Sequence, residues 1–345
     1  MPSQTQHYYQ TPGHIIAAGI ILALLDIVVV TLRFIGRLRT KQELQIDDWL
    51  LLPATVLTTG VGALLVVGVT QEAFGYRTIP TSRENPSDEA LQQMTLAIRF
   101  EWTISIILPI ALACNKASFL FFYRRLFSIS RRVSWLLWSL VGFVVAWAIA
   151  FVIATLMCCN VMTTAIWQPV AEMAQCVFFL QILMAFCITG FVTDLVIIAV
   201  PIPLVWRLRL DTPRKLMACA SFLLGTVTVA CALARLVVSV DFVNTAADPD
   251  NDNILNISLY VYWAMVEASM GVFAACLPTL QLFFRRWSGW EILSSKTRSL
   301  FSSRSSSTNN DNDPKDPQVH YQFYAGRKEN NVGFPVRVPQ WDTDQ

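Results

Sequence analysis

The feature that most constrains this chain is a set of seven apolar runs, each long enough to cross a lipid bilayer as a helix. A bilayer core is about 30 Å thick, and a helix needs about 20 apolar residues to span it. Only 14% of the 345 residues are charged, against about 25% in a typical soluble domain. The predicted fold is therefore all-α, a seven-transmembrane-helix bundle. The predicted spans are His14–Gly36, Trp49–Val69, Arg99–Phe127, Val133–Met157, Cys176–Val205, Leu216–Val243 and Ile257–Phe284.

The basic residues alternate between the two sides of this bundle. The loops after the first, third and fifth spans and the segment after the seventh contain Lys and Arg, whereas the loops after the fourth and sixth contain none. Because positively charged loops stay in the cytosol, we predict that the N-terminus is outside and the C-terminus is cytosolic.

This topology predicts three parts of the chain. Residues 1–13 are an extracellular N-terminus, residues 14–286 are the transmembrane domain, and residues 287–345 are a cytosolic tail. The tail is rich in Ser and Asn and has too few apolar residues to fold alone, so we expect it to be disordered. The predicted location is a membrane, either the plasma membrane or an endomembrane.

Among the charged residues inside the apolar runs, five are candidates for an intramembrane polar cluster. Asp26, Lys116 and Asp194 fall at similar depths, roughly 12–20 Å from the cytosolic ends at 1.5 Å per residue, whereas Arg235 and Glu267 lie in the outer half. Charges at such depths are costly, so they usually face the bundle interior and pair with each other. We predict that Lys116 pairs with Asp194, or alternatively with Asp26, and that Arg235 pairs with Glu267. Such pairs either fix the helix packing or form a polar site, and sequence spacing is compatible with both.

Several kinds of site are absent from the sequence. It lacks metal-ligand spacing, a glycine-rich phosphate loop and a nucleophile elbow, and its three histidines are all terminal. The seventh predicted span has no lysine to form a Schiff base with retinal. We therefore expect no metal, no cofactor and no nucleic-acid partner, with membrane lipid around the bundle.

Two covalent features are predicted on the outer side. Cys159 and Cys176 lie at the two predicted ends of the loop after the fourth span, where the oxidising side of a membrane permits a disulfide. Cys158 is a rival for the same partner, and free thiols are the alternative. Asn256-Ile257-Ser258 is an N-glycosylation sequence in or near the last outer loop, which would make the chain a glycoprotein.

Motifs along residues 15–286 carry a family resemblance. They are Asp47-Asp48-Trp49-Leu50, Lys116-Ala117-Ser118, Phe122-Tyr123-Arg124-Arg125-Leu126-Phe127, Asp194, Pro201-Ile202-Pro203, Leu208, Lys215, Gly225, Arg235, Trp263, Glu267 and Ala275-Cys276-Leu277-Pro278. With these motifs the chain resembles the fungal rhodopsin-domain membrane proteins, which include the satratoxin-cluster membrane protein family and fungal orphan seven-helix receptors. Two segments depart from the family pattern: Phe74-Gly75-Tyr76 after the second span and Cys158-Cys159-Asn160, which lacks the usual proline.

The resemblance implies a seven-helix fold and an association with secondary-metabolite gene clusters. We expect a receptor-like or sensory protein that binds a lipophilic small molecule and engages a cytosolic signalling partner. One alternative is a membrane-embedded cyclase whose acid is Asp26, Glu101, Asp194 or Glu267. Another is a transporter of a hydrophobic metabolite.

Overall fold

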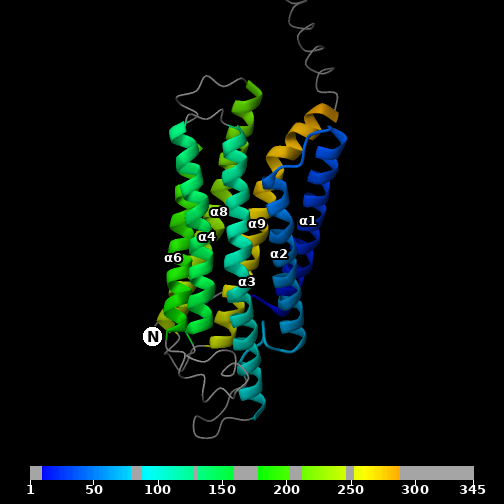
Figure 1. The fold of residues 1–345 in the computed structure, drawn as a ribbon. Helices are drawn as coiled ribbons and strands as arrows, with labels where there is room; N and C mark the ends of the chain where they lie inside the picture. Colours follow the sequence, from blue (N-terminus) through cyan, green and yellow to red (C-terminus); the bar gives the residue numbers. More distant parts are fainter. Residues whose placement is uncertain are drawn as a thin grey trace, which may run out of the picture. The chain divides into compact units, whose positions relative to one another are not determined.

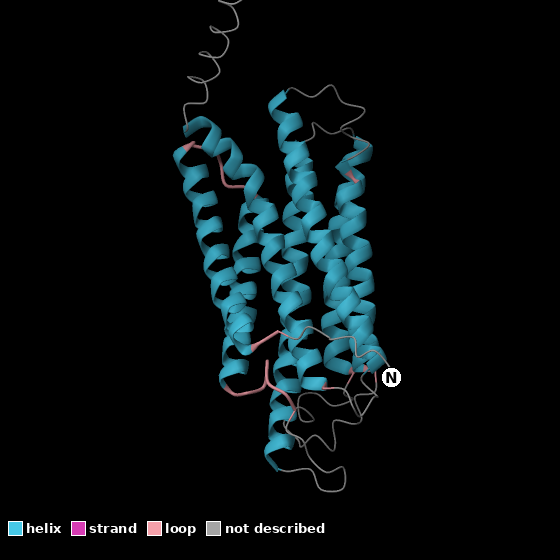
Figure 2. Cartoon of the chain, turned by 180° about the vertical axis from the view of Figure 1, so that it is seen from behind, coloured by secondary structure: helices cyan, strands magenta, loops and turns pink. Residues whose placement is uncertain are grey.

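The computed structural model describes residues 10–78, 88–126, 131–158, 178–201, 212–245 and 252–287. These residues contain no strand and form seven helices that are long and apolar enough to cross a membrane. The helices lie side by side with their axes roughly aligned (Figures 1 and 2). They are α1 (Pro12–Arg39), α2 (Ile46–Thr70), α3 (Asp88–Leu126), α4 (Arg131–Met157), α6 (Phe179–Ala199), α8 (Thr212–Thr245) and α9 (Asn253–Trp287).

The all-helical fold with seven candidate spans is thereby confirmed for the described part of the chain. The sidedness of the two termini stays a prediction. The predicted tail lies outside the described residues from residue 288 onward. One end of the bundle, the upper end in Figure 1, carries the last turns of α1 and α3 with Arg37, Arg39, Arg124 and Arg125. We call it the basic end.

Helix α3 begins earlier than the sequence predicted. The predicted third span began at Arg99, whereas α3 starts at Asp88. Two acidic residues, Asp88 and Glu89, occupy the first turn, where free N–H groups and the helix dipole favour negative charge. The 39 residues of α3 correspond to about 58 Å of helix at 1.5 Å per residue. Its first turns extend beyond the neighbouring helices at the lower end of Figure 1.

Helices α3 and α9 form the centre of the bundle. Helix α3 packs against α2, α4, α6 and α9, and α9 packs against α1, α2, α3 and α8. Within the most apolar segment of each of these two helices 67% of the residues are buried, against 22–39% in the other five. Glu101 and Lys116 on α3 and Glu267 on α9 are buried, so these charged residues are held inside the protein and away from lipid.

Two glycines bring α1 and α2 close together. A Cβ atom added at Gly19 would lie 2.9 Å from the Gly62 carbonyl oxygen, and one added at Gly62 would lie 2.7 Å from the Gly19 carbonyl oxygen. No side chain fits at those distances, so the two backbones touch directly, as small residues allow in membrane helices. This contact holds α1 beside α2 and so positions the charged residues at the basic end, where α1 ends and α2 begins.

Candidate functional site

Lys116 and Asp194 form an ion pair between α3 and α6. The Lys116 Nζ atom lies 3.0 Å from Asp194 Oδ1 and donates a hydrogen bond of 2.9 Å to the carbonyl oxygen of Gly190, one turn earlier on α6. The ammonium also lies 5.1 Å from the ring centre of Trp147 on α4, where the ring face attracts a cation. This is the first of the two pairings predicted for Lys116, and Asp26 was the alternative.

Arg235 on α8 and Glu267 on α9 form a second ion pair. Arg235 Nη2 donates to Glu267 Oε1 at 3.1 Å, and Arg235 Nε donates to Oε2. Such two-point contacts fix orientation as well as charge. The guanidinium lies 4.8 Å from the ring centre of Phe186, and a Cβ atom at Gly190 would lie 3.3 Å from Arg235 Nη2. Gly190 therefore touches both ion pairs.

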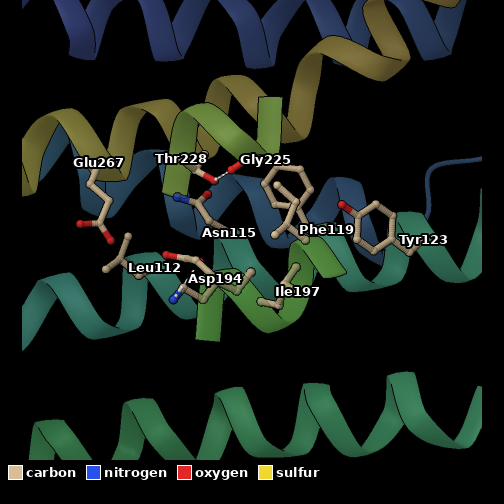
Figure 3. Close-up of a pocket in the computed structure, with 12 residues that line it drawn as sticks. Leu112, Asn115, Phe119, Tyr123, Asp194, Ile197, Gly225, Thr228 and Glu267 are labelled. Atoms are coloured by element: carbon tan, nitrogen blue, oxygen red, sulfur yellow. Dashed lines mark hydrogen bonds and ion pairs between the residues drawn. The ribbon is translucent and has the colours of Figure 1, made fainter. Parts of the chain in front are cut away.

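Three of these four charged residues, Lys116, Asp194 and Glu267, line one cavity between α3, α6, α8 and α9 (Figure 3). Its enclosed volume is about 30 Å³, room for about two water molecules, so a larger ligand requires the surrounding helices to move apart. Its polar wall contains Asn115, Lys116, Asp194, Thr228 and Glu267, and its apolar wall contains Leu112, Phe119, Ile197 and Ile198. Polar groups converging in an apolar pocket are the usual composition of a ligand site.

Asp26 lies apart from these pairs, between α1 and α9. It is fully buried and accepts a hydrogen bond of 2.8 Å from Ser269 Oγ on its Oδ2 atom, whereas its Oδ1 atom has no hydrogen-bond partner. Within the described residues Asp26 makes no ion pair, so it is not the partner of Lys116. Of the predicted intramembrane cluster, Lys116, Asp194 and Glu267 thus line one cavity, Arg235 is paired with Glu267 beside it, and Asp26 lies elsewhere.

Glu101 is a buried carboxyl group without a cation partner among the described residues. It lies on α3 with 2% of its surface exposed, and its Oε1 atom has no hydrogen-bond partner. A lone carboxylate is costly in an apolar interior, so such a group takes up a proton. It is one of the candidate acids named for the enzyme hypothesis.

Four charged residues form a buried network at the basic end, joining α1 to α2. Arg33 lies 2.6 Å from Asp47 Oδ2 and 2.7 Å from Asp48 Oδ1, and Arg37 lies 2.8 Å from the same two atoms. We call these four residues the basic-end cluster; at most 2% of any of them is exposed. Arg33 Nη1 also donates to the carbonyl oxygen of Ala275 on α9 at 2.5 Å.

Sequence reasoning missed the two arginines of this cluster. The predicted first span ended at Gly36, which left Arg37 in the loop, and Arg33 within that span was not singled out. Asp47 and Asp48, directly before the predicted second span, lie in the first turn of α2. In the structure α1 continues to Arg39, so Arg33 and Arg37 lie one turn apart on one face of it. That four-residue spacing near an Asp-Asp pair was the available signal.

The remaining family-motif residues are distributed over α6 and α9. Pro201 is buried just after the end of α6. Trp263 is half-buried on α9, with its ring 5.9 Å from that of Tyr262. Pro278 lies within α9, and Pro203 is outside the described residues. Neither Pro201 nor Trp263 lines the cavity.

The two covalent predictions remain predictions. Cys159 and Cys176 both lie outside the described residues. Asn256 was expected in or near a loop, but it is the fourth residue of α9 and is 8% exposed, with its amide nitrogen 3.4 Å from Thr245 Oγ1. A buried helical asparagine is a poor glycosylation acceptor, because the sugar is carried on surface loops.

Comparison with known proteins assigns the chain to a family. The sequence profile of the fungal rhodopsin domain matches residues 32–286. Over 98 residues the chain is 38% identical to a SAT4 family membrane protein of Emericella nidulans, covering 28% of this chain and 22% of that protein. Over 256 residues it is 23% identical to Receptor GIN3 of Arthrobotrys oligospora, covering 73% and 57%. Over 206 residues it is 25% identical to the polyenoic acids biosynthesis gene cluster protein Ba17b of Metarhizium anisopliae, covering 59% and 54%.

The chain thus spans less than two thirds of the length of each of these relatives. The profile, in contrast, covers nearly all of the helical bundle, from within α1 to the end of α9. With its seven apolar helices, this chain is a multi-pass membrane protein that belongs to the fungal rhodopsin domain family.

Proposed function

We propose that this protein is a receptor-like membrane protein that binds a lipophilic small molecule in the cavity between α3, α6, α8 and α9. The observation that carries the proposal is the convergence of Lys116, Asp194 and Glu267, from three different helices, on one apolar-walled space. Charged residues inside a membrane bundle are expensive, and they commonly mark functional sites. A ligand that enters between the helices changes how these helices pack.

Two helices offer a route from the cavity to the basic end. On α3, Asn115 and Lys116 line the cavity, and Ser118 Oγ donates a hydrogen bond of 2.9 Å to the carbonyl oxygen of Asp47. On α9, Gly271 lines the cavity, and Ala275, one turn later, accepts the hydrogen bond from Arg33. A shift of α3 against α9 would therefore strain the basic-end cluster. We propose that the basic end faces the cytosol and that a signalling partner reads this change.

The names of the relatives agree with this proposal. One is named as a receptor, and two others are named as proteins of biosynthetic clusters, for polyenoic acids and for fugralins. We propose that the ligand of this chain is a secondary metabolite or one of its precursors. The similarity to these relatives is distant, so their own ligands are not carried over.

A membrane-embedded enzyme is the second candidate, and one observation favours it. Glu101 is a buried carboxyl group whose Oε1 atom has no hydrogen-bond partner, so it could donate a proton to an apolar substrate. The ion-paired state of Asp194 and Glu267 makes those two carboxylates less suited to the same role.

Ligand capture tests the receptor proposal. Wild type and a Thr228→Phe variant are purified from the native host in lipid nanodiscs, and their retained small molecules are compared by mass spectrometry. Thr228 lines the cavity, so the larger ring fills it. Val227→Phe is the matched control, because Val227 is the preceding residue on α8 and is 45% exposed on the outside of the bundle. We expect a compound that wild type and the control retain and Thr228→Phe loses, and equal retention by all three would contradict the proposal.

Metabolite profiling of a deletion strain separates the receptor from its alternatives. An uncyclised precursor that accumulates in the deletion strain, and also in a Glu101→Gln strain, would favour the enzyme. Finished product retained inside the cells would favour a transporter. A receptor changes the response of the cells to added compound without either defect.

A further inference from the structure

The charges around the cavity compensate one another within the protein. Lys116 is paired with Asp194 at 3.0 Å, and Glu267 is held by both Nε and Nη2 of Arg235. Each pair sums to zero, so the cavity wall has no net charge left for an ionic ligand. An incoming carboxylate or amine would have to displace one partner and leave a buried charge unpaired, which is strongly unfavourable.

One polar group of the cavity wall is left without a partner. Asn115 is 2% exposed and lines the cavity (Figure 3). Its Nδ2 group donates a hydrogen bond of 3.0 Å to the carbonyl oxygen of Ala268 on α9, whereas its Oδ1 atom has no hydrogen-bond partner. Gly271 holds this orientation, because a Cβ atom there would lie 2.7 Å from Asn115 Nδ2. The amide is thus wedged against α9 with an unused acceptor.

A buried acceptor without a partner is matched by a ligand group that donates a hydrogen bond. Leaving such an oxygen unpaired costs about 1–3 kcal/mol, and a ligand that supplies an O–H group recovers that free energy. A ligand with an acceptor alone, or with no polar group, recovers none of it. The apolar wall of Leu112, Phe119, Ile197 and Ile198 favours a hydrocarbon body next to that hydroxyl group.

We infer that the cavity selects a neutral lipophilic alcohol or phenol, whose hydroxyl group donates a hydrogen bond to Asn115 Oδ1. The inference rests on the proposed function, since it names the ligand class of the same cavity. It assigns Asn115 as the specificity-determining residue and gives the two ion pairs a supporting role, in which they keep the cavity polar but electrically neutral.

Competition binding tests this inference with a defined probe. Tritiated 1-naphthol is bound to the protein in lipid nanodiscs, and empty nanodiscs give the bilayer background. The unlabelled competitors are 1-naphthol, its methyl ether, naphthalene and 1-naphthoate, compared at equal measured concentration in the bilayer. The methyl ether keeps the oxygen and loses the donor, so the comparison with 1-naphthol isolates the hydrogen bond on the ligand side.

We expect saturable binding of 1-naphthol, with the methyl ether and naphthalene about tenfold to a hundredfold weaker, the range that one satisfied buried acceptor gives. The anion 1-naphthoate is expected to compete more weakly still. In Asn115→Leu the advantage of 1-naphthol over its ether is expected to disappear. If that variant does not fold, the competition series in wild type still decides the matter. Ergosterol is added to the nanodiscs as a further competitor. If ergosterol displaces the probe, the hydroxyl compound is a membrane sterol; if it does not, the compound is a smaller alcohol.

Two failures are distinguishable. If 1-naphthol binding is saturable and is lost in Thr228→Phe but not in Val227→Phe, and yet the ether or the carboxylate competes equally well, the cavity is a ligand site and the hydroxyl selectivity is wrong. If no saturable binding depends on Thr228, both the ligand site and the inference fail, and the Asn115 oxygen is matched by water alone.

Discussion

Removing one partner of the Lys116–Asp194 pair is expected to cost more than removing both. Their side chains are 6% and 11% exposed, and breaking a buried ion pair costs about 3–5 kcal/mol because the remaining charge is stranded. Lys116→Met leaves Asp194 without a cation, so we expect a loss of about 3–5 kcal/mol in the free energy of unfolding. Asp194→Leu leaves Lys116 its hydrogen bond to Gly190 and its contact with Trp147, so the loss is expected at the lower limit of that range.

The double variant measures the coupling directly. It replaces both charges by apolar side chains, so its loss is expected to be smaller than the sum of the single losses by about 2 kcal/mol or more. The assay is reversible unfolding in lipid bicelles, followed by the intrinsic tryptophan fluorescence of the bundle. Additivity of the two losses within about 0.5 kcal/mol would refute the reasoning. As a control, Asp26→Leu combined with Lys116→Met is expected to be additive, because Asp26 contacts Ser269 instead.

Three further predictions concern two buried carboxyl groups, the contact between α1 and α2, and the sidedness of the C-terminus. Glu267→Gln is expected to lower the free energy of unfolding by about 3 kcal/mol or more, because it strands Arg235. Glu101→Gln is expected to change it by less than about 1 kcal/mol, because an unpaired buried carboxyl group is already neutral. The same bicelle assay measures both variants, and equal losses would contradict this prediction. Gly62→Ala is expected to cost about 1–3 kcal/mol by pushing α1 from α2, whereas Gly60→Ala, where nothing lies within 4 Å of the added Cβ, is expected to be neutral or stabilising. A reporter fused to the C-terminus is expected to be inaccessible in intact cells, and labelling from outside would overturn the predicted sidedness.

The pairing of charges inside the bundle could be predicted because depth is a one-dimensional quantity. The residue number along an apolar run fixes how far a side chain lies from the membrane surface at about 1.5 Å per residue. This was enough to pair Glu267 with Arg235 and to limit the partners of Lys116 to Asp194 and Asp26; the structure pairs Lys116 with Asp194 and Arg235 with Glu267. It also placed Asp26 at a suitable depth, but depth says nothing about which face of a helix a residue occupies.

Features that depend on helix faces and helix ends could not be predicted in the same way. The cavity requires four helices to be oriented together, and the free acceptor of Asn115 follows from its contact with α9. The basic-end cluster was hidden because α1 continues beyond its predicted span to Arg39. Arg37 therefore resembled an ordinary loop charge, although it is buried beside Arg33.

The most direct test of the account is whether the basic-end cluster and the cavity are energetically coupled. The measurement is the affinity of the compound retained by the cavity, in wild type and in two variants, Ser118→Ala and Arg33→Lys, that do not touch the cavity. Ser118→Ala removes the hydrogen bond to the Asp47 carbonyl oxygen, and Arg33→Lys removes the fork that joins α2 to Ala275. The cavity and the basic-end cluster are linked through α3 and α9. Loosening the cluster is therefore expected to lower the ligand affinity about fivefold or more, the usual size of a coupling between sites. An affinity within about twofold of wild type in both folded variants, as expected for the control Ile35→Ala, whose side chain is 40% exposed on α1, would contradict the account.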